Sequence, residues 1–170
     1  NTTSNTYTAA AQSNGFTTSG LLGSDNATGV SGLATRTNVG TTADTLSAAT
    51  GTGLGNYSIS YVNGSLTITP ASLTLSAVSD SRVYDGGTSS SGTVAVAGVL
   101  GSDSITGVSQ RFASRNVLGT NGSIMLVNGG YTVNDGNGGA NYLVTTNSAS
   151  GTITPAALTV GIADVTRVYD

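Results

Sequence analysis

Two stretches of this sequence repeat each other. Residues 66–85 read LTITPASLTLSAVSDSRVYD, and residues 151–170 read GTITPAALTVGIADVTRVYD. Their matching positions lie 85 residues apart, and self-similarity at a fixed spacing is the sequence signature of a repeat architecture. We interpret the shared residues as the structural signature of the repeat: Pro70, Arg82, Tyr84 and Asp85 in one copy, and Pro155, Arg167, Tyr169 and Asp170 in the next.

A second match lies upstream, where GLLGSD at 20–25 resembles GVLGSD at 98–103, at a spacing of 78 residues. Because the spacing then grows to 85, the second copy carries about six extra residues. Their Gly- and Asn-rich composition, around 128–140, predicts a longer surface loop. We therefore predict a first repeat over 1–70 with a truncated N-terminal strand, a second repeat over 71–154, and the start of a third, truncated repeat over 155–170.

Alternating apolar and polar residues predict β-strands. We expect strands over residues 73–78, 93–100, 123–127, 131–133 and 158–162. Within 57–69, the pair Asn63-Gly64 predicts a tight type I′ hairpin, because both residues tolerate positive φ. No apolar period of 3.6 residues is sustained, so we expect at most single helical turns, at 21–25 and 99–103.

These features predict an all-β fold of small, Ig-like β-sandwich modules. A strand that runs into Pro70 is followed almost at once by another strand, and proline fixes φ and cannot continue a β ladder. Such a short, stiff connection restricts the angle between modules. We therefore expect the repeat modules to be arranged end to end as a rod.

The composition excludes most chemistry. Only 8% of the residues are charged, the net charge is −3, and the chain has no Cys, His, Lys, Glu or Trp. Without His and Cys the usual zinc and iron sites cannot form, and most activated nucleophiles and general bases are missing. Nucleic-acid binding needs clustered cations, and no apolar stretch is long enough to span a bilayer. We predict no enzyme activity, no nucleic-acid partner and no membrane insertion.

Acidic and amide side chains are the candidate metal ligands. Asp80, Asp85, Asp103, Asp135 and Asp164 fall in predicted turns or near a junction, where oxygen ligands could bind Ca²⁺ and stiffen a stalk. Asn134, Asp135 and Asn137 form the densest group. However, the usual calcium-loop pattern is absent, and Asx residues in turns usually bind their own backbone. We therefore expect no cofactor, with Ca²⁺ as the alternative.

Arg82 and Tyr84 lie on the same side of a predicted strand, as do Arg167 and Tyr169. One interpretation is a repeated sugar-binding pair, in which Tyr stacks on the sugar and Arg donates hydrogen bonds. The other is architectural: Tyr packs in the core, and Arg pairs with a nearby Asp. We favour the architectural interpretation, because the pair occurs once per repeat.

The RVYDG signature at 82–86, the GLLGSD and GVLGSD segments, and NYSISYVNGSLTITPASLTL at 56–75 resemble the MBG and YDG repeat domains of large bacterial surface proteins. The first repeat is similar to MBG repeats and the second to YDG repeats. One departure is Tyr7-Thr8-Ala9, which stands where YDG is expected. The resemblance implies a Gram-negative, secreted adhesin of the filamentous-haemagglutinin-like, two-partner-secreted kind, in which such repeats are spacers.

We therefore expect a structural stalk at the bacterial outer surface, which contacts neighbouring repeats of the same chain. It would project a binding region for cell–cell or cell–matrix adhesion and biofilm formation. Two alternatives stay open. One is a module that binds glycan or exopolysaccharide through loops such as 128–140. The other is a self-associating filament module whose exposed strand edges pair with like chains.

Overall fold

The structure is a computed structural model that describes residues 2–163 and 167–169. The described residues form strands and loops, with one short 3₁₀ turn, η1 (Leu54–Asn56). The predicted all-β fold is confirmed. In this part of the chain, no helix is long and apolar enough to cross a membrane.

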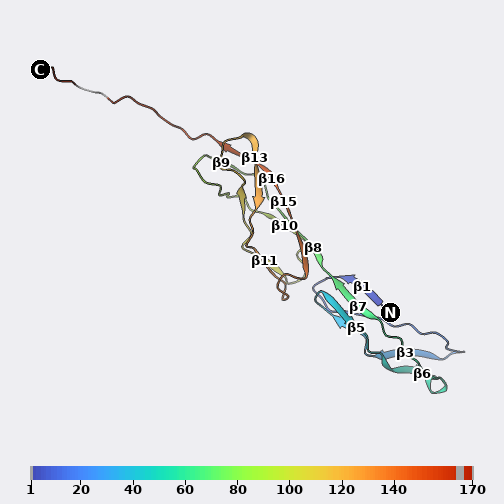
Figure 1. The fold of residues 1–170 in the computed structure, drawn as a ribbon. Helices are drawn as coiled ribbons and strands as arrows, with labels where there is room; N and C mark the ends of the chain where they lie inside the picture. The colour runs from blue at the N-terminus through green and yellow to red at the C-terminus, as the bar shows by residue number, and fades with distance from the viewer. Residues whose placement is uncertain (1, 164–166, 170) are drawn as a thin grey trace.

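The strands before Pro70 form small sheets and ribbons (Figure 1). In the three-stranded sheet, β7 is central, with β1 parallel on one side and β5 antiparallel on the other. Two antiparallel ribbons, β2–β4 and β3–β6, complete this part. The strands are β1 (Thr2–Thr6), β2 (Gln12–Ser13), β3 (Asn26–Ser31), β4 (Thr35–Arg36), β5 (Gly40–Ala43), β6 (Ser47–Thr52) and β7 (Ser65–Thr69).

The strands after Pro70 form a four-stranded sheet, β12-β13-β16-β9, a three-stranded sheet, β10-β8-β15, and the ribbon β11–β14. β16 pairs in parallel with β9, and β15 pairs in parallel with β8. The strands are β8 (Ala71–Ser76), β9 (Ser81–Val83), β10 (Ala95–Ala97), β11 (Ser104–Thr106), β12 (Gln110–Phe112), β13 (Gly119–Val127), β14 (Thr132–Asn134), β15 (Tyr142–Asn147) and β16 (Ala149–Thr154).

The strand pairs on the two sides of Pro70 have corresponding registers. Ile68 lies opposite Asn5 on one neighbour and Gly40 on the other. The matching Ile153 lies opposite Arg82 and Gly119. The parallel partner comes from far along the chain in both cases, so the pairing is non-local.

The buried apolar residues form two clusters. The larger one draws on both sides of Pro70, and its buried members are Tyr7, Ala34, Leu66, Ile68, Ala71, Leu73 and Tyr142. The smaller one lies wholly after Pro70 and consists of Ala77, Phe112, Met125 and Ile153. Because the larger cluster includes side chains from β7 and from β8, burial couples the segments before and after Pro70.

The predicted hairpin over residues 57–69 is wrong. Residues 65–69 form β7, but residues 57–64 form no β ladder. Neither Asn63 nor Gly64 has the positive φ that a type I′ turn needs. Asn63 instead accepts a hydrogen bond from the Leu46 N–H through Oδ1, at 2.9 Å. The neighbours of β7 are β1 and β5 rather than the segment just before it.

The strand predicted over 158–162 is also wrong. These residues form no ladder, and Leu158, Val160 and Ile162 are 87%, 86% and 97% exposed. The corresponding Leu73 and Leu75 are fully buried, because β10 and β15 flank β8 on its two sides. No described residue flanks 158–162 in this way, and an isolated strand has no partner for its backbone groups.

Candidate functional site

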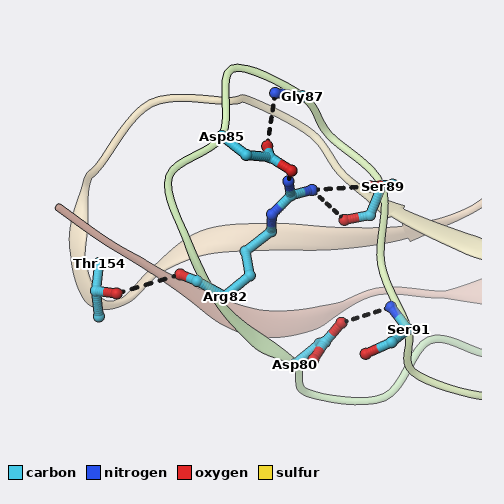
Figure 2. Close-up of polar contacts among 7 residues, drawn as sticks. All are labelled: Asp80, Arg82, Asp85, Gly87, Ser89, Ser91 and Thr154. Carbon is cyan, nitrogen blue, oxygen red and sulfur yellow. Dashed lines mark hydrogen bonds and ion pairs between the residues drawn. The ribbon is translucent and has the colours of Figure 1, made fainter. Parts of the chain in front are cut away.

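Arg82 of the repeat signature closes a loop that follows β9 (Figure 2). Its guanidinium forms an ion pair with Asp85 and donates hydrogen bonds to the backbone oxygen and the hydroxyl of Ser89. It also lies 6.0 Å from the centroid of the Phe112 ring. Asp85 in turn accepts the Gly87 N–H at 2.8 Å. With its donors engaged and its side chain only 14% exposed, Arg82 holds the loop together rather than facing a ligand.

Asp80 fastens the other end of the same loop. One oxygen of its carboxylate accepts the Ser81 N–H at 2.8 Å, and the other accepts the Ser91 N–H at 3.0 Å and the Ser90 hydroxyl. The Ser90 hydroxyl is the main cause that lowers the pKa of Asp80. Hydrogen bonds to an ionised carboxylate favour its charged form. Asp80 is therefore a loop anchor in this structure.

Tyr84 does not pack in the core, contrary to the architectural interpretation for this tyrosine. It is 40% exposed, and Tyr169 is 99% exposed. Tyr7, at the matching place in the first repeat, is only 3% exposed. The backbone around the two signature tyrosines is alike, because Tyr7 N–H donates to Thr69 and Tyr84 N–H donates to Thr154. The difference lies in what covers each side chain.

Tyr7 is covered by residues from the far side of Pro70. Its hydroxyl donates to Asp103 Oδ2 at 2.9 Å, and the Tyr142 hydroxyl donates to the same oxygen at 2.7 Å. The two rings meet edge to face, with centroids 5.5 Å apart. The Tyr142 hydroxyl also accepts the Leu100 N–H at 2.9 Å. We name Tyr7, Asp103 and Tyr142 the junction triad.

The junction triad shifts the acidity of its phenols. Burial, followed by the hydrogen bond to Asp103, raises the pKa of Tyr142 to about 12. The same two causes raise the pKa of Tyr7. Burial in a low dielectric disfavours the phenolate, and a neighbouring carboxylate disfavours it further. Both tyrosines therefore stay protonated hydrogen-bond donors at neutral pH.

Asn141 bridges the same junction and is fully buried. Its Oδ1 accepts the Val39 N–H at 2.9 Å, and its Nδ2 donates to Asn38 Oδ1 at 3.1 Å. Its backbone oxygen accepts the Ala71 N–H at 2.9 Å. One side chain thus joins the loop before β15 to the segment before β5.

The candidate calcium ligands in the 134–141 loop already serve other donors and acceptors. The buried Asp135 carboxylate accepts the N–H groups of Asn137 and Gly139 at 2.8 Å and of Asn141 at 2.9 Å. Burial acts to raise the pKa of Asp135, but these backbone hydrogen bonds outweigh it and hold the pKa low. Asn134 Nδ2 donates to hydroxyls on β11, and Asn137 Nδ2 donates to Asn141.

The other candidate ligands do not converge either. Asp80 and Asp85 anchor the loop after β9, and Asp103 belongs to the junction triad. Within residues 2–163 and 167–169, no group of three or more acidic side chains is gathered to hold a metal ion. Asp164 and Asp170 lie outside the described residues. Arg167 is exposed, and Pro70 and Pro155 each follow a strand directly.

The first repeat carries a counterpart of part of the triad. The Tyr57 hydroxyl donates to Asp25 Oδ2 at 2.8 Å and accepts the Leu22 N–H at 3.0 Å. These partners match Tyr142, Asp103 and Leu100. Beside them lies a groove of about 450 Å³, whose lining includes Val30, Leu46, Leu54, Ile59 and Tyr61.

Sequence reasoning missed the residues that make the junction. Asn141 and Tyr142 stand out as a pair that matches Asn56 and Tyr57, and Asp103 lies in the GVLGSD segment. Recurrence of both motifs in each repeat was the available signal. It does not reveal that Tyr7, from the preceding repeat, completes the set, because that contact joins residues far apart in sequence.

The comparisons with known proteins bear on the second half of the chain. No curated protein and no solved structure matches the sequence. Residues 69–149 match the family model of the YDG domain. This segment contains the junction residues Asp103, Asn141 and Tyr142, together with Arg82 and Asp85 of the repeat signature. The chain therefore carries a YDG domain over residues 69–149, as the resemblance predicted.

Proposed function

We propose that this chain is a pair of consecutive spacer repeats from an extracellular stalk that projects a binding region from a bacterial surface. The observation that carries the proposal is the junction across Pro70. Side chains of the first repeat complete the core and the polar contacts of the second, so the two repeats hold a defined orientation. A spacer needs this property in order to transmit extension along its length.

The connection itself supports the proposal. β7 ends at Thr69 and β8 begins at Ala71, so Pro70 alone separates the two strands. Proline fixes φ near −65° and removes a backbone donor. A linker of one stiff residue leaves few conformations between the repeats, in contrast to a flexible Gly/Ser linker.

The side-chain contacts restrict the orientation further. Tyr7 bonds to Asp103, and Asn141 bonds to Val39 and Asn38. Each such bond contributes about 1 kcal/mol, and leaving a buried partner without it costs about 1–3 kcal/mol. Bending at Pro70 would break all of these contacts and would also expose the apolar cluster around Tyr142.

The residue inventory supports a non-catalytic, structural role. The chain has no His and no Cys, and the buried carboxylates of Asp44 and Asp135 are engaged with neighbouring N–H groups. The YDG domain and the resemblance to adhesin repeats support the extracellular setting. Glycan binding through the 128–140 loop has less support, because the amides of Asn134 and Asn137 bond within the fold.

Small-angle X-ray scattering at low protein concentration tests the proposal, with Asn141→Ala as the variant that opens the junction. Repeats fixed end to end give a radius of gyration of about 22–26 Å, whereas a compact domain of this length gives about 15–16 Å. We expect the native chain to give the larger value with a rigid profile, and the variant to give a more flexible one. A compact native particle would overturn the spacer proposal.

A further inference from the structure

One segment of the first repeat has the form of a strand without a partner. Residues 57–62 correspond to β15 of the second repeat, which pairs in parallel with β8. Among the described residues none forms a ladder with 57–62. Ile59, Tyr61 and Val62 are consequently 43%, 40% and 80% exposed. An exposed apolar strand edge is a template for another chain.

The groove of about 450 Å³ lies beside this segment. Its lining includes Ile59 and Tyr61 from the unpaired segment and Val30 and Leu46 from the β3–β6 ribbon. In the second repeat, the corresponding side of β15 is occupied by β8, whose Leu73 and Leu75 are fully buried. The groove therefore has the place that a β8-like strand would fill.

A β8-like strand lies at the opposite end of the same chain. Leu158 and Val160 are 87% and 86% exposed, and they match Leu73 and Leu75 of β8. Residues 155–163 are all exposed, and they form no ladder with the described residues. This segment is apolar at the alternate positions that β8 buries, yet nothing in the described part of the chain covers it.

We propose that residues 156–162 of one copy of this chain add as a strand to a second copy, parallel to residues 57–62 and inside its groove. The register follows from that of β8 and β15, where Ala71 lies opposite Tyr142 and Leu73 lies opposite Val144. Ala156 then lies opposite Tyr57, Leu158 opposite Ile59, and Val160 opposite Tyr61. Main-chain hydrogen bonds give the affinity, and the buried alternate side chains give the specificity.

Polar groups at the two ends are complementary in the same way. Inside one chain, Tyr7 donates to Asp103, which also accepts from Tyr142. Asp25 has the corresponding bond from Tyr57, and Tyr84, the counterpart of Tyr7, is 40% exposed at the end that carries residues 156–162. The Tyr84 hydroxyl of one copy donates to Asp25 of the next. The intermolecular contact thus reproduces the junction already present within the chain.

This contact uses different surfaces on the two copies. Such heterologous contacts extend into open, head-to-tail assemblies when the rotation does not close a ring. The copy that accepts the strand leaves its own residues 156–162 free for the next copy. The inference does not depend on the spacer role, because it rests on the unpaired segment, the groove and the exposed strand of this chain.

Sedimentation equilibrium from about 10 μM to about 1 mM tests the inference, because an association weaker than the upper limit is negligible. We expect a mass that grows with concentration, and Leu158→Asp with Val160→Asp to weaken the association at least about tenfold. Both residues are exposed in the isolated chain, so the variant folds normally, which circular dichroism checks. Ile124→Asp, at an equally exposed apolar position on β13, is the matched control and leaves association unchanged.

Hydrogen exchange and a competing peptide locate the contact. Amides of residues 57–62 gain protection as concentration rises, and a peptide of sequence PAALTVGIA, residues 155–163, dissociates the assemblies where a scrambled peptide does not. A chain that stays monomeric to about 1 mM overturns the inference. So does an assembly that persists unchanged in the Leu158→Asp, Val160→Asp variant, because copies then meet through another surface.

Discussion

Replacing Asp103 by alanine tests the junction most sharply, because one oxygen of Asp103 serves two tyrosines. The hydroxyls of Tyr7 and Tyr142 both donate to Oδ2, and these tyrosines are only 3% and 7% exposed. Hydrogen bonds to charged groups contribute about 1.5–3 kcal/mol each, and a buried donor without a partner adds a desolvation cost. The partial exposure of Asp103 reduces the sum, so we expect Asp103→Ala to lower the free energy of unfolding by about 3 kcal/mol.

The first repeat supplies a matched control. Asp25→Ala removes the same group from the corresponding turn, but Asp25 accepts only from Tyr57, which is half-buried. That variant should lose about 1 kcal/mol. Urea unfolding followed by far-ultraviolet circular dichroism measures both, with equal slopes as the check on a common mechanism.

A double-mutant cycle removes the remaining ambiguity. In a chain that already carries Tyr7→Phe and Tyr142→Phe, Asp103→Ala should cost less than about 1 kcal/mol, because no phenol is left to be stranded. Equal, small losses for Asp103→Ala and Asp25→Ala would refute the account of the junction. An undiminished loss in the double phenylalanine background would refute the role of the hydroxyls.

Three further predictions concern single positions. The folded-state pKa of Asp135 is lowered, so its stabilisation is present above the unfolded pKa of about 3.9 and is lost as pH falls through the folded pKa; Asp135→Asn should reduce stability at pH ~7 and flatten its dependence below pH ~4 in urea unfolding. Gly151→Ala should cost about 1–3 kcal/mol in the same assay, because its Cβ would lie 2.8 Å from Phe112 Cε1. Ala9→Gly should raise the melting temperature, since Ala9 has φ 63° where Gly86, its counterpart, has φ 83°.

The sequence predicted the class of fold and much of the strand content. Alternation of apolar residues identified β8, and its Leu73 and Leu75 are fully buried as that pattern requires. The repeat spacing indicated which positions correspond in the two halves of the chain. These signals are local, or depend only on comparison of the chain with itself.

The errors come from pairings that are distant in sequence. Asn63-Gly64 has the composition of a hairpin turn, but its downstream strand pairs with β1 and β5. Leu158 and Val160 have the alternation of a strand, but alternation indicates which face could be buried and says nothing of a partner. The junction triad was missed for the same reason, because Tyr7 and Asp103 lie in different repeats.

The central claim is that the two repeats are held in one orientation across Pro70, and pulsed electron–electron resonance tests it most directly. The chain has no cysteine, so Thr28→Cys and Thr120→Cys, at exposed positions on β3 and β13, place one spin label in each repeat. Labelled chain is diluted into unlabelled chain to remove distances between copies. The account predicts one narrow distance distribution that broadens when Asn141→Ala is added. A broad distribution in the chain with native Asn141 would contradict it.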